Sequence, residues 1–253
     1  MRGTISYGGP NRPPQAGPVL GVDTAGRSGS VAIASSGKIE ALTLLKPGRT
    51  YAESLASEVF RLLKSRRLEP RDLAGVAVSA GPGSFTGLRI AIGTALGMVA
   101  ALGIPIVGVE TLWAWALALG RRKETVCPAL DAGKGCVFSA SFLWEEDRLV
   151  RRSEDSVLSP EALCDGVDGP AVMWGDGAER FSEVIGRLGG EKVRLIPRPD
   201  WPAVAGEVAL CGETRIRRGD VDSPAGFRIR YVREPEAEVQ WRRRYQQTRI
   251  KSG

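Results

Sequence analysis

Three features of the sequence predict an α/β fold made of two similar halves. Short apolar runs bounded by Gly-containing turns are typical of strands, and longer segments between them carry apolar residues at helical spacing. The order of these segments begins again near residue 125. The composition agrees, because 253 residues with 43% hydrophobic and 25% charged side chains suffice for one large or two small folded units.

The first half opens with three predicted strands, at residues 19–24, 30–35 and 38–45. Short Gly-containing turns join them, which predicts an antiparallel meander. The apolar side chains of residues 50–66 recur at helical spacing and predict a helix with one buried face. The predicted elements that follow are a strand at 73–79, a long helix rich in Ala, Gly and Ile at 85–102, a strand at 104–109 and a helix ending near residue 118.

The second half repeats this pattern with apolar runs at 126–130 and 136–144 around a turn at 131–135. We expect a weaker strand at 149–158, a short helix at 160–164, a strand at 171–175 and helices at 178–188 and 203–217 to complete this half. Three strands followed by alternating helices and strands form neither a Rossmann alternation nor a barrel. This is the order of one half of the actin-like ATPase fold (ASKHA, ribonuclease H-like), which the sequence therefore predicts.

Four segments are predicted along the chain. Residues 1–18 are rich in Gly and Pro and lack the apolar core of a signal peptide, so we expect a disordered leader. The N-terminal half takes residues 19–120, the C-terminal half 121–235, and a basic tail 236–253. The most apolar stretch, residues 90–109, is interrupted by four glycines and one proline, which argues against a membrane span.

The formal charge of +6 is concentrated at the two ends of the chain. Residues 1–18 contribute +2 and residues 241–253 contribute +5, so the remainder carries −1. Arg242, Arg243 and Arg244 stand beside Trp241 and Tyr245, a pattern that suits contact with an RNA backbone and its bases. A solvated terminal tail is the alternative interpretation.

The chain contains no histidine, which excludes a Ser-His-Asp or Cys-His relay and an HExxH zinc site. Its four cysteines form no CxxC pair and are too few to staple a chain of this length, which is typical of a reducing compartment. We therefore expect a cytoplasmic protein.

Two turns have the residue types of a nucleotide site. In the first hairpin, the carboxylate of Asp23 could hold a hydrated magnesium, while Thr24, Gly26 and Ser28 could bind phosphates. Asp131, in the turn that opens the second half, could hold a second metal-bound water. The alternative for both segments is a tight turn in which Asp, Thr and Gly satisfy the backbone.

Residues 81–90 join a predicted buried strand to the long helix. They are not a phosphate loop of the GxxxxGK[ST] type, because no lysine follows the second glycine. They predict a sharp elbow, with Ser84 or Thr86 capping the helix. Beyond it, small residues form a thin flank that another helix, from this chain or from a partner, should approach closely; they are Ala91, Gly93, Ala95 and Gly97.

Several segments together resemble the TsaB (YeaZ) family: residues 19–24 with 30–32, then the specific run 81–90, then 108–112. Weaker matches continue at 129–132 and 231–233, so the resemblance is strong over residues 19–115. It implies an actin-like fold without catalysis of its own, acting as scaffold and activator in bacterial synthesis of N6-threonylcarbamoyladenosine (t6A) at position 37 of tRNA. The implied partners are a TsaD-like catalytic subunit and a TsaE-like ATPase, with tRNA as the substrate of the complex.

The resemblance implies no catalytic residue, no metal ligand and no cofactor of the chain's own, with ATP and magnesium bound only in the complex if at all. The implied partner interface lies on the helices at 50–66 and 85–102, and an isolated chain could pair with itself there. The implied interface residues are Tyr51, Leu55, Ser84, Phe85, Thr86, Gly87, Arg89, Ile90, Gly93 and Gly97.

The chain departs from the family pattern at two places. Members usually carry a histidine near the start of the first long helix, where this chain has Tyr51. After the position of Asp131 they usually carry an Ala-Arg pair, and this chain has Gly133 and Lys134 instead. TsaD-like relatives bind iron through paired histidines, which this chain cannot supply. The alternative function that the residues leave open is an actin-like small-molecule kinase or ATPase with its own nucleotide site.

Overall fold

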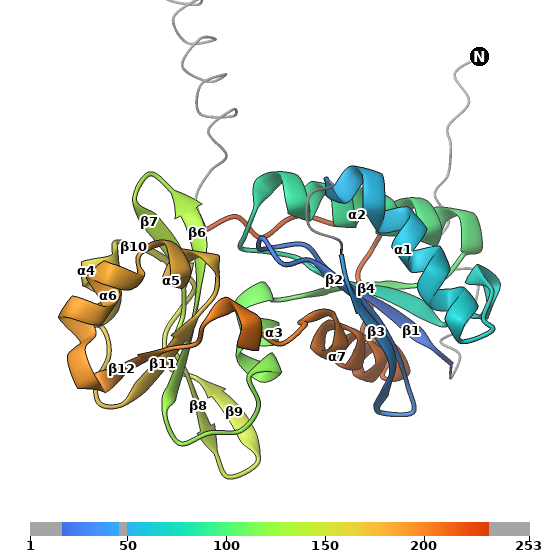
Figure 1. Ribbon diagram of the computed structural model, residues 1–253. Helices are drawn as coiled ribbons and strands as arrows, with labels where there is room; N and C mark the ends of the chain where they lie inside the picture. The colour runs from blue at the N-terminus through green and yellow to red at the C-terminus, as the bar shows by residue number, and fades with distance from the viewer. Residues whose placement is uncertain (1–16, 46–49, 233–253) are drawn as a thin grey trace, which may run out of the picture.

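The computed structural model describes residues 17–45 and 50–232. These residues form two mixed β-sheets with helices packed against them, which confirms the predicted α/β architecture of two halves (Figure 1). The predicted leader falls outside the described residues except for Gly17 and Pro18. The basic tail, with Arg242, Arg243 and Arg244, lies outside them entirely.

The first sheet has five strands in the order β3-β2-β1-β4-β5. The predicted meander is present as β1 (Val19–Asp23), β2 (Ser30–Ser35) and β3 (Lys38–Leu44), all antiparallel neighbours. Parallel pairing then adds β4 (Gly75–Ser79) beside β1 and β5 (Ile106–Val109) beside β4. Because β1 and β4 are covered on both faces, their sequences are nearly continuous apolar runs.

Two helices, α1 (Tyr51–Ser65) and α2 (Phe85–Leu102), cover one face of this sheet (Figure 1). The bounds of α2 match the prediction because both ends are strongly marked. Its N-cap Ser84 Oγ accepts a hydrogen bond from the Gly87 amide at 3.2 Å. At the other end, Gly103 adopts a left-handed conformation with φ of 66°.

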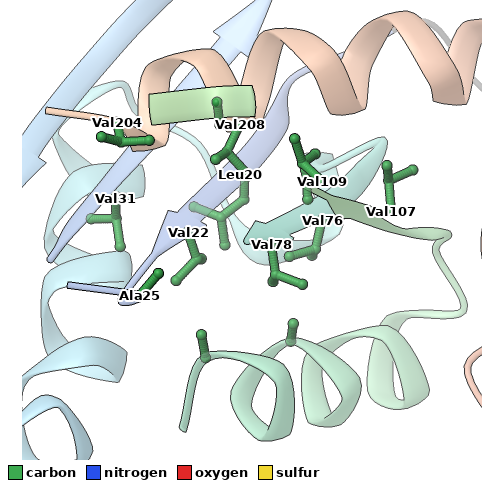
Figure 2. Close-up of a cluster of buried hydrophobic side chains, with 14 of the residues drawn as sticks. Leu20, Val22, Ala25, Val31, Val76, Val78, Val107, Val109, Val204 and Val208 are labelled. Atoms are coloured by element: carbon green, nitrogen blue, oxygen red, sulfur yellow. The ribbon is translucent and has the colours of Figure 1, made fainter. Parts of the chain in front are cut away.

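The opposite face is covered by α7 (Ala205–Arg217), which packs against β1, β4 and β2. The expectation that this helix completes the second half is therefore wrong. Glycines make the contact possible, since a Cβ on Gly21 would lie 2.3 Å from the Ala205 carbonyl oxygen and one on Gly212 would lie 2.3 Å from the Ala77 Cβ. Figure 2 shows the apolar core between the two helix layers, with Leu20, Val22, Val76, Val78 and Val208 pointing into it.

The second sheet has seven strands, arranged around the long β6 (Thr125–Gly133). The predicted strand at 136–144 is two strands, because β6 pairs with β7 (Cys136–Ser139) along its second part and with β8 (Phe142–Glu145) near its start. The remaining strands are β9 (Arg148–Arg151), β10 (Ser156–Leu158), β11 (Ala171–Trp174) and β12 (Val193–Leu195).

The helices of the second half are short. They are α4 (Pro160–Asp165), α5 (Asp176–Arg180) and α6 (Ser182–Gly189), and the single helix predicted at 178–188 is divided at Phe181. The junction between the halves is formed by α3 (Thr111–Ala118), which contacts both β6 and α7. From α3, Trp115 stacks on Trp174 of β11 with ring centroids 4.5 Å apart, so one apolar core continues through both halves.

By length and composition alone, α2 is apolar enough to cross a membrane. That property is weak support for a span, since core helices of soluble proteins share it. Here one side of α2 packs on β4, β1 and β5.

Candidate interdomain cleft and helix face

A cleft of about 890 Å³ lies between the first hairpin and the opening turn of the second half. Of the predicted nucleotide residues, it is lined by Gly26, Ser28 and Asp131. Asp23 and Thr24 do not line it, because both are fully buried beneath the hairpin. The prediction that all five residues share one site is therefore wrong. The other side chains that characterise the cleft are Arg27, Tyr51, Ser84, Asp176, Arg198 and Trp201.

The carboxylate of Asp23 is directed into the protein. Its Oδ1 accepts hydrogen bonds from Ser79 Oγ at 2.5 Å and from the Ala25 amide at 3.4 Å. Its Oδ2 forms no hydrogen bond of normal geometry within the described chain, although the Trp115 indole is close enough to favour the charged carboxylate. Burial outweighs these contacts and raises the pKa of Asp23 to about 6.

Thr24 is also committed to the interior. Its hydroxyl donates to the Gly87 carbonyl oxygen at 2.8 Å, which ties the first hairpin to the start of α2. Gly26 lies over Trp115, whose ring would be 2.8 Å from a Cβ at this position. The hairpin therefore has the close packing that the alternative interpretation, a tight turn, requires.

Asp131 faces the cleft but is already paired. It forms an ion pair with Arg180 at 2.8 Å and accepts the Gly133 amide of its own turn at 2.9 Å. Next to it, Asp176 accepts the Asp131 amide at 3.1 Å, and burial raises the pKa of Asp176 above its usual value. Of the two carboxylates that the sequence suggests for magnesium, Asp23 is therefore enclosed and Asp131 is paired with Arg180.

Sequence reasoning missed Asp176, Arg180, Arg27 and Arg198. The first of these had a visible signal, because Gly175-Asp176-Gly177 follows the buried strand β11 in the same way that Asp23 ends β1. Arg180 lies one helical turn after Asp176, on the side that faces Asp131. Arg27 lies in a loop and Arg198 begins the short 3-10 helix Arg198–Asp200, and neither segment is long enough for periodicity to point to it.

The predicted partner interface divides into exposed and buried residues. Leu55 is only 1% exposed, and Gly87 is buried with no space for a side chain, so both predictions are wrong for this arrangement of helices. Tyr51 is half-buried and donates its hydroxyl to the Gly26 carbonyl oxygen at 2.6 Å, which turns it toward the cleft. The apolar stripe of α1 is its core-facing side, and that is why it cannot also face a partner.

The outer side of α2 is exposed and almost uncharged. Gly93 and Gly97 are exposed, and a Cβ on either would contact nothing within 4 Å. Ile90 and Phe85 are half-buried at the margin, and Ser84 is exposed at the N-cap. We define the α2 face as the exposed positions of this helix, namely Thr86, Arg89, Gly93, Gly97, Ala100 and Ala101.

An exposed helix face with a single charged side chain is unusual, because solvent-facing helix positions are ordinarily polar or charged. Two exposed glycines also lower helix stability by about 1 kcal/mol each relative to alanine. On the neighbouring helix α1, Phe60 is a large apolar side chain that sequence reasoning missed, and it is 60% exposed. These features are typical of a surface that another macromolecule covers.

The topology, with an antiparallel meander extended by parallel crossovers and this order begun again after a junction helix, defines an actin-like α/β protein of two halves. A family model described as "TsaD: tRNA N6-adenosine threonylcarbamoyltransferase" matches residues 46–179. The Escherichia coli tRNA threonylcarbamoyladenosine biosynthesis protein TsaB is 34% identical over 159 residues, which are 62% of this chain and 68% of that protein. This chain belongs to the TsaB (YeaZ) family.

Two further relatives extend the match along the chain. The Bacillus subtilis TsaB protein is 28% identical over 235 residues, covering 88% of this chain and 97% of that protein. A solved structure of YeaZ from Pseudomonas aeruginosa superposes with a TM-score of 0.71 at 23% identity, over 85% of this chain and 99% of that one. The structural similarity to that protein therefore extends over both halves of this chain. The chain is a member of a family of tRNA threonylcarbamoyladenosine biosynthesis proteins.

Proposed function

We propose that this chain is the non-catalytic scaffold and activator subunit of a bacterial t6A synthesis complex, and that its α2 face docks a TsaD-like catalytic subunit. The observation that supports the proposal most directly is the open space at Gly93 and Gly97. Helix glycines without side-chain neighbours let a second helix approach to backbone distance. Family membership supplies the setting, a tRNA modification pathway.

The proposal assigns no catalytic residue and no cofactor to this chain. Its support is that Asp23 and Asp131, the two carboxylates with the right types for actin-like chemistry, are occupied by Ser79 and Arg180. In the complex, a TsaE-like ATPase and the tRNA substrate complete the assembly, and any ATP and magnesium bind outside this chain's cleft. The chain acts in the cytoplasm, where tRNA is modified.

The direct test is association in solution. The purified chain and the TsaD-like subunit of the same organism are mixed at equal concentration and followed by sedimentation velocity. One faster-sedimenting species supports the proposal, and two independently sedimenting species contradict it. The chain alone, run over a concentration series, reports whether a second copy occupies the same face when the partner is absent.

A further inference from the structure

Arg89 is the single charged side chain of α2, and the other exposed positions of this helix are Thr86, Gly93, Gly97, Ala100 and Ala101. Helical geometry places it on the same side as Gly93 and Ala100, which follow after about one and about three turns. Among the described residues, no carboxylate forms an ion pair with it. Within residues 17–45 and 50–232, its charge is therefore not balanced by an ion pair.

The guanidinium of Arg89 is held in place by an aromatic ring. Its Cζ lies 3.8 Å from the centroid of the Phe85 ring, one turn earlier on the same helix. This cation–π contact leaves the edge of the guanidinium, with its N–H groups, free to donate hydrogen bonds. The side chain has thus given up part of its conformational freedom before any partner arrives, which lowers the entropy cost of binding through it.

Phe85 is in turn supported by the C-terminal segment. Tyr231 packs on Phe85 with ring centroids 5.9 Å apart, and it is 40% exposed beside the α2 face. We call residues 222–232 the strap, because they run past β5 from Ile106 and continue to Ala80, just after β4, and to Phe85 at the start of α2. The strap is fixed by Asp222, whose amide donates to Ile106 at 3.0 Å and whose Oδ2 accepts the Gly108 amide at 2.7 Å.

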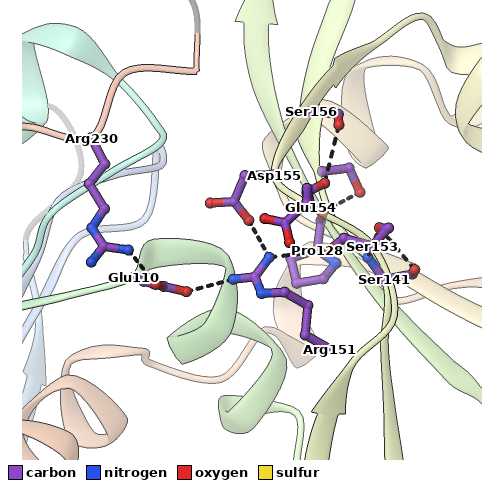
Figure 3. A network of polar contacts seen from close by, with 10 residues as sticks. Glu110, Pro128, Ser141, Arg151, Ser153, Glu154, Asp155, Ser156 and Arg230 are labelled. Carbon is purple, nitrogen blue, oxygen red and sulfur yellow. Dashed lines mark hydrogen bonds and ion pairs between the residues drawn. The ribbon is translucent and has the colours of Figure 1, made fainter.

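The end of the strap is fixed as firmly as its beginning. The Arg230 amide donates to the Ala80 carbonyl oxygen at 2.8 Å, and a Cβ on Gly81 would lie 2.4 Å from the Arg230 carbonyl oxygen. Figure 3 shows the Arg230 side chain paired with Glu110, which also accepts from Arg151 of the second half. Partial burial would raise the pKa of Glu110, but the charges of Arg230 and Arg151 outweigh it and lower that pKa.

We propose that Arg89, stacked on Phe85 and supported by Tyr231, is the electrostatic anchor of the docking face and binds an aspartate or glutamate side chain of the protein partner. This inference rests on the proposed function, because it takes the α2 face to be the docking surface. An arginine enclosed by glycine and alanine is stripped of water when a partner covers it, and only a carboxylate compensates that desolvation well. RNA is a poorer match, since binding to its backbone needs several basic groups together and this face carries one.

The test compares substitutions of Arg89 in the full chain, binding to the TsaD-like subunit by calorimetry at low and at physiological salt. We expect Arg89→Met to weaken binding at least tenfold and Arg89→Glu to weaken it further, because a like charge then opposes the partner's carboxylate. Arg89→Lys keeps the charge but not the planar fork and should fall between wild type and Arg89→Met. The control is Arg71→Met, a change of the same type at an exposed position of the short helix Pro70–Asp72.

Each result decides for or against the anchor. Binding of Arg89→Met within twofold of wild type overturns it while leaving the docking proposal intact, whereas failure of the wild-type chain to bind removes both. Equal effects of Arg89→Met and Arg89→Glu contradict a carboxylate partner. If the Met variant binds the TsaD-like subunit normally and has reduced affinity for tRNA instead, the charge serves RNA and the inference is wrong. Tyr231→Leu should reduce affinity for the TsaD-like subunit by a smaller factor than Arg89→Met does. Unchanged circular dichroism spectra and unfolding midpoints confirm that the variants fold.

Discussion

Thr24 and Gly87 are locked together across the start of α2: the Thr24 hydroxyl donates to the Gly87 carbonyl oxygen at 2.8 Å, and a Cβ on Gly87 would lie 2.0 Å from the Thr24 carbonyl oxygen. The obstacle is backbone, which cannot rotate away as a flexible side chain could. The start of α2 and the first hairpin of the cleft are therefore tied directly to each other.

Gly87→Ala should destabilise the protein by about 1–3 kcal/mol, because the helix start must move away from the hairpin. Gly93→Ala, on the same helix but in open space, should be neutral or stabilising by about 0.5–1 kcal/mol, since alanine favours the helix. Urea unfolding of the two variants measures the difference. Equal unfolding midpoints would show that the contact with Thr24 has no energetic weight.

Gly97→Glu and Gly93→Glu should each reduce affinity for the TsaD-like subunit at least tenfold, because a long charged side chain would occupy the space that a partner helix needs. Glutamate is a good helix former, so the fold should be retained. Gly186→Glu is the matched control, since Gly186 is also a mid-helix glycine in open space, on α6 of the second half. An equal effect of all three changes in a calorimetric titration would disconnect the α2 face from docking.

Asp23 predicts a specific dependence of stability on pH. Its folded-state pKa, raised to about 6 from 3.8, means that the folded protein binds a proton that the unfolded chain releases. The free energy of unfolding therefore falls as pH rises from about 4 to about 6, by on the order of 3 kcal/mol from this group, and it stays lower above that range. Asp23→Asn should remove this slope.

The control for that experiment is Asp147→Asn, because the Asp147 side chain is 90% exposed in the β8–β9 turn. Chemical unfolding is measured for both variants and wild type between pH 4 and 7. Parallel curves for wild type and Asp23→Asn would mean that the buried carboxyl titrates normally.

Titration of the purified chain with ATP and magnesium tests the alternative function of a kinase or ATPase. We expect no heat of binding, since the carboxylates suited to the metal are Asp23, which is enclosed, and Asp131, which Arg180 neutralises. Saturable heat would instead assign the cleft to a nucleotide. In that case Arg180→Ala should strengthen the binding by releasing Asp131.

Deletion of residues 241–253 tests the predicted contact of the basic tail with tRNA. These residues carry a charge of +5, so their removal should weaken tRNA binding and reduce the slope of log affinity against log salt by up to about 0.9 for each phosphate group that the tail neutralises. A binding assay over a salt series, with chain and complex both tested, measures that slope. An unchanged slope would leave the tail as a solvated extension.

Much of the fold could be predicted because its signals are local. The ends of α2 are set by Ser84 and Gly103, and the meander follows from short turns between apolar runs. The position of α7 could not be predicted, since periodicity indicates that a helix buries one face but not which sheet it covers. The division of residues 136–144 depends on β6 pairing with two different strands, which is a tertiary fact.

The candidate site was predicted less well for the same reason. The sequence shows small residues at Gly93 and Gly97 on the predicted helix. Only the fold shows that these two glycines face open space, whereas Gly87 packs against Thr24. Leu55 belongs to an apolar helical stripe and Gly26 to a Gly-containing turn, and both patterns can be recognised in the sequence. Whether each residue faces the core, a cleft or the solvent depends on long-range packing. Arg180 pairs with Asp131, which lies 49 residues earlier in the chain. Tyr231 packs on Phe85, which lies much farther away in the sequence.

The return of α7 to the first sheet has a consequence for biosynthesis. Residues 119–204, between α3 and α7, form the second half. The first half is built from the segments before and after them in the sequence. A nascent chain halted before residue 217 lacks the layer that shields β1 and β4 from water, even though α1 and α2 have already left the ribosome. The first half therefore reaches its complete packing only after the whole second half has been synthesised.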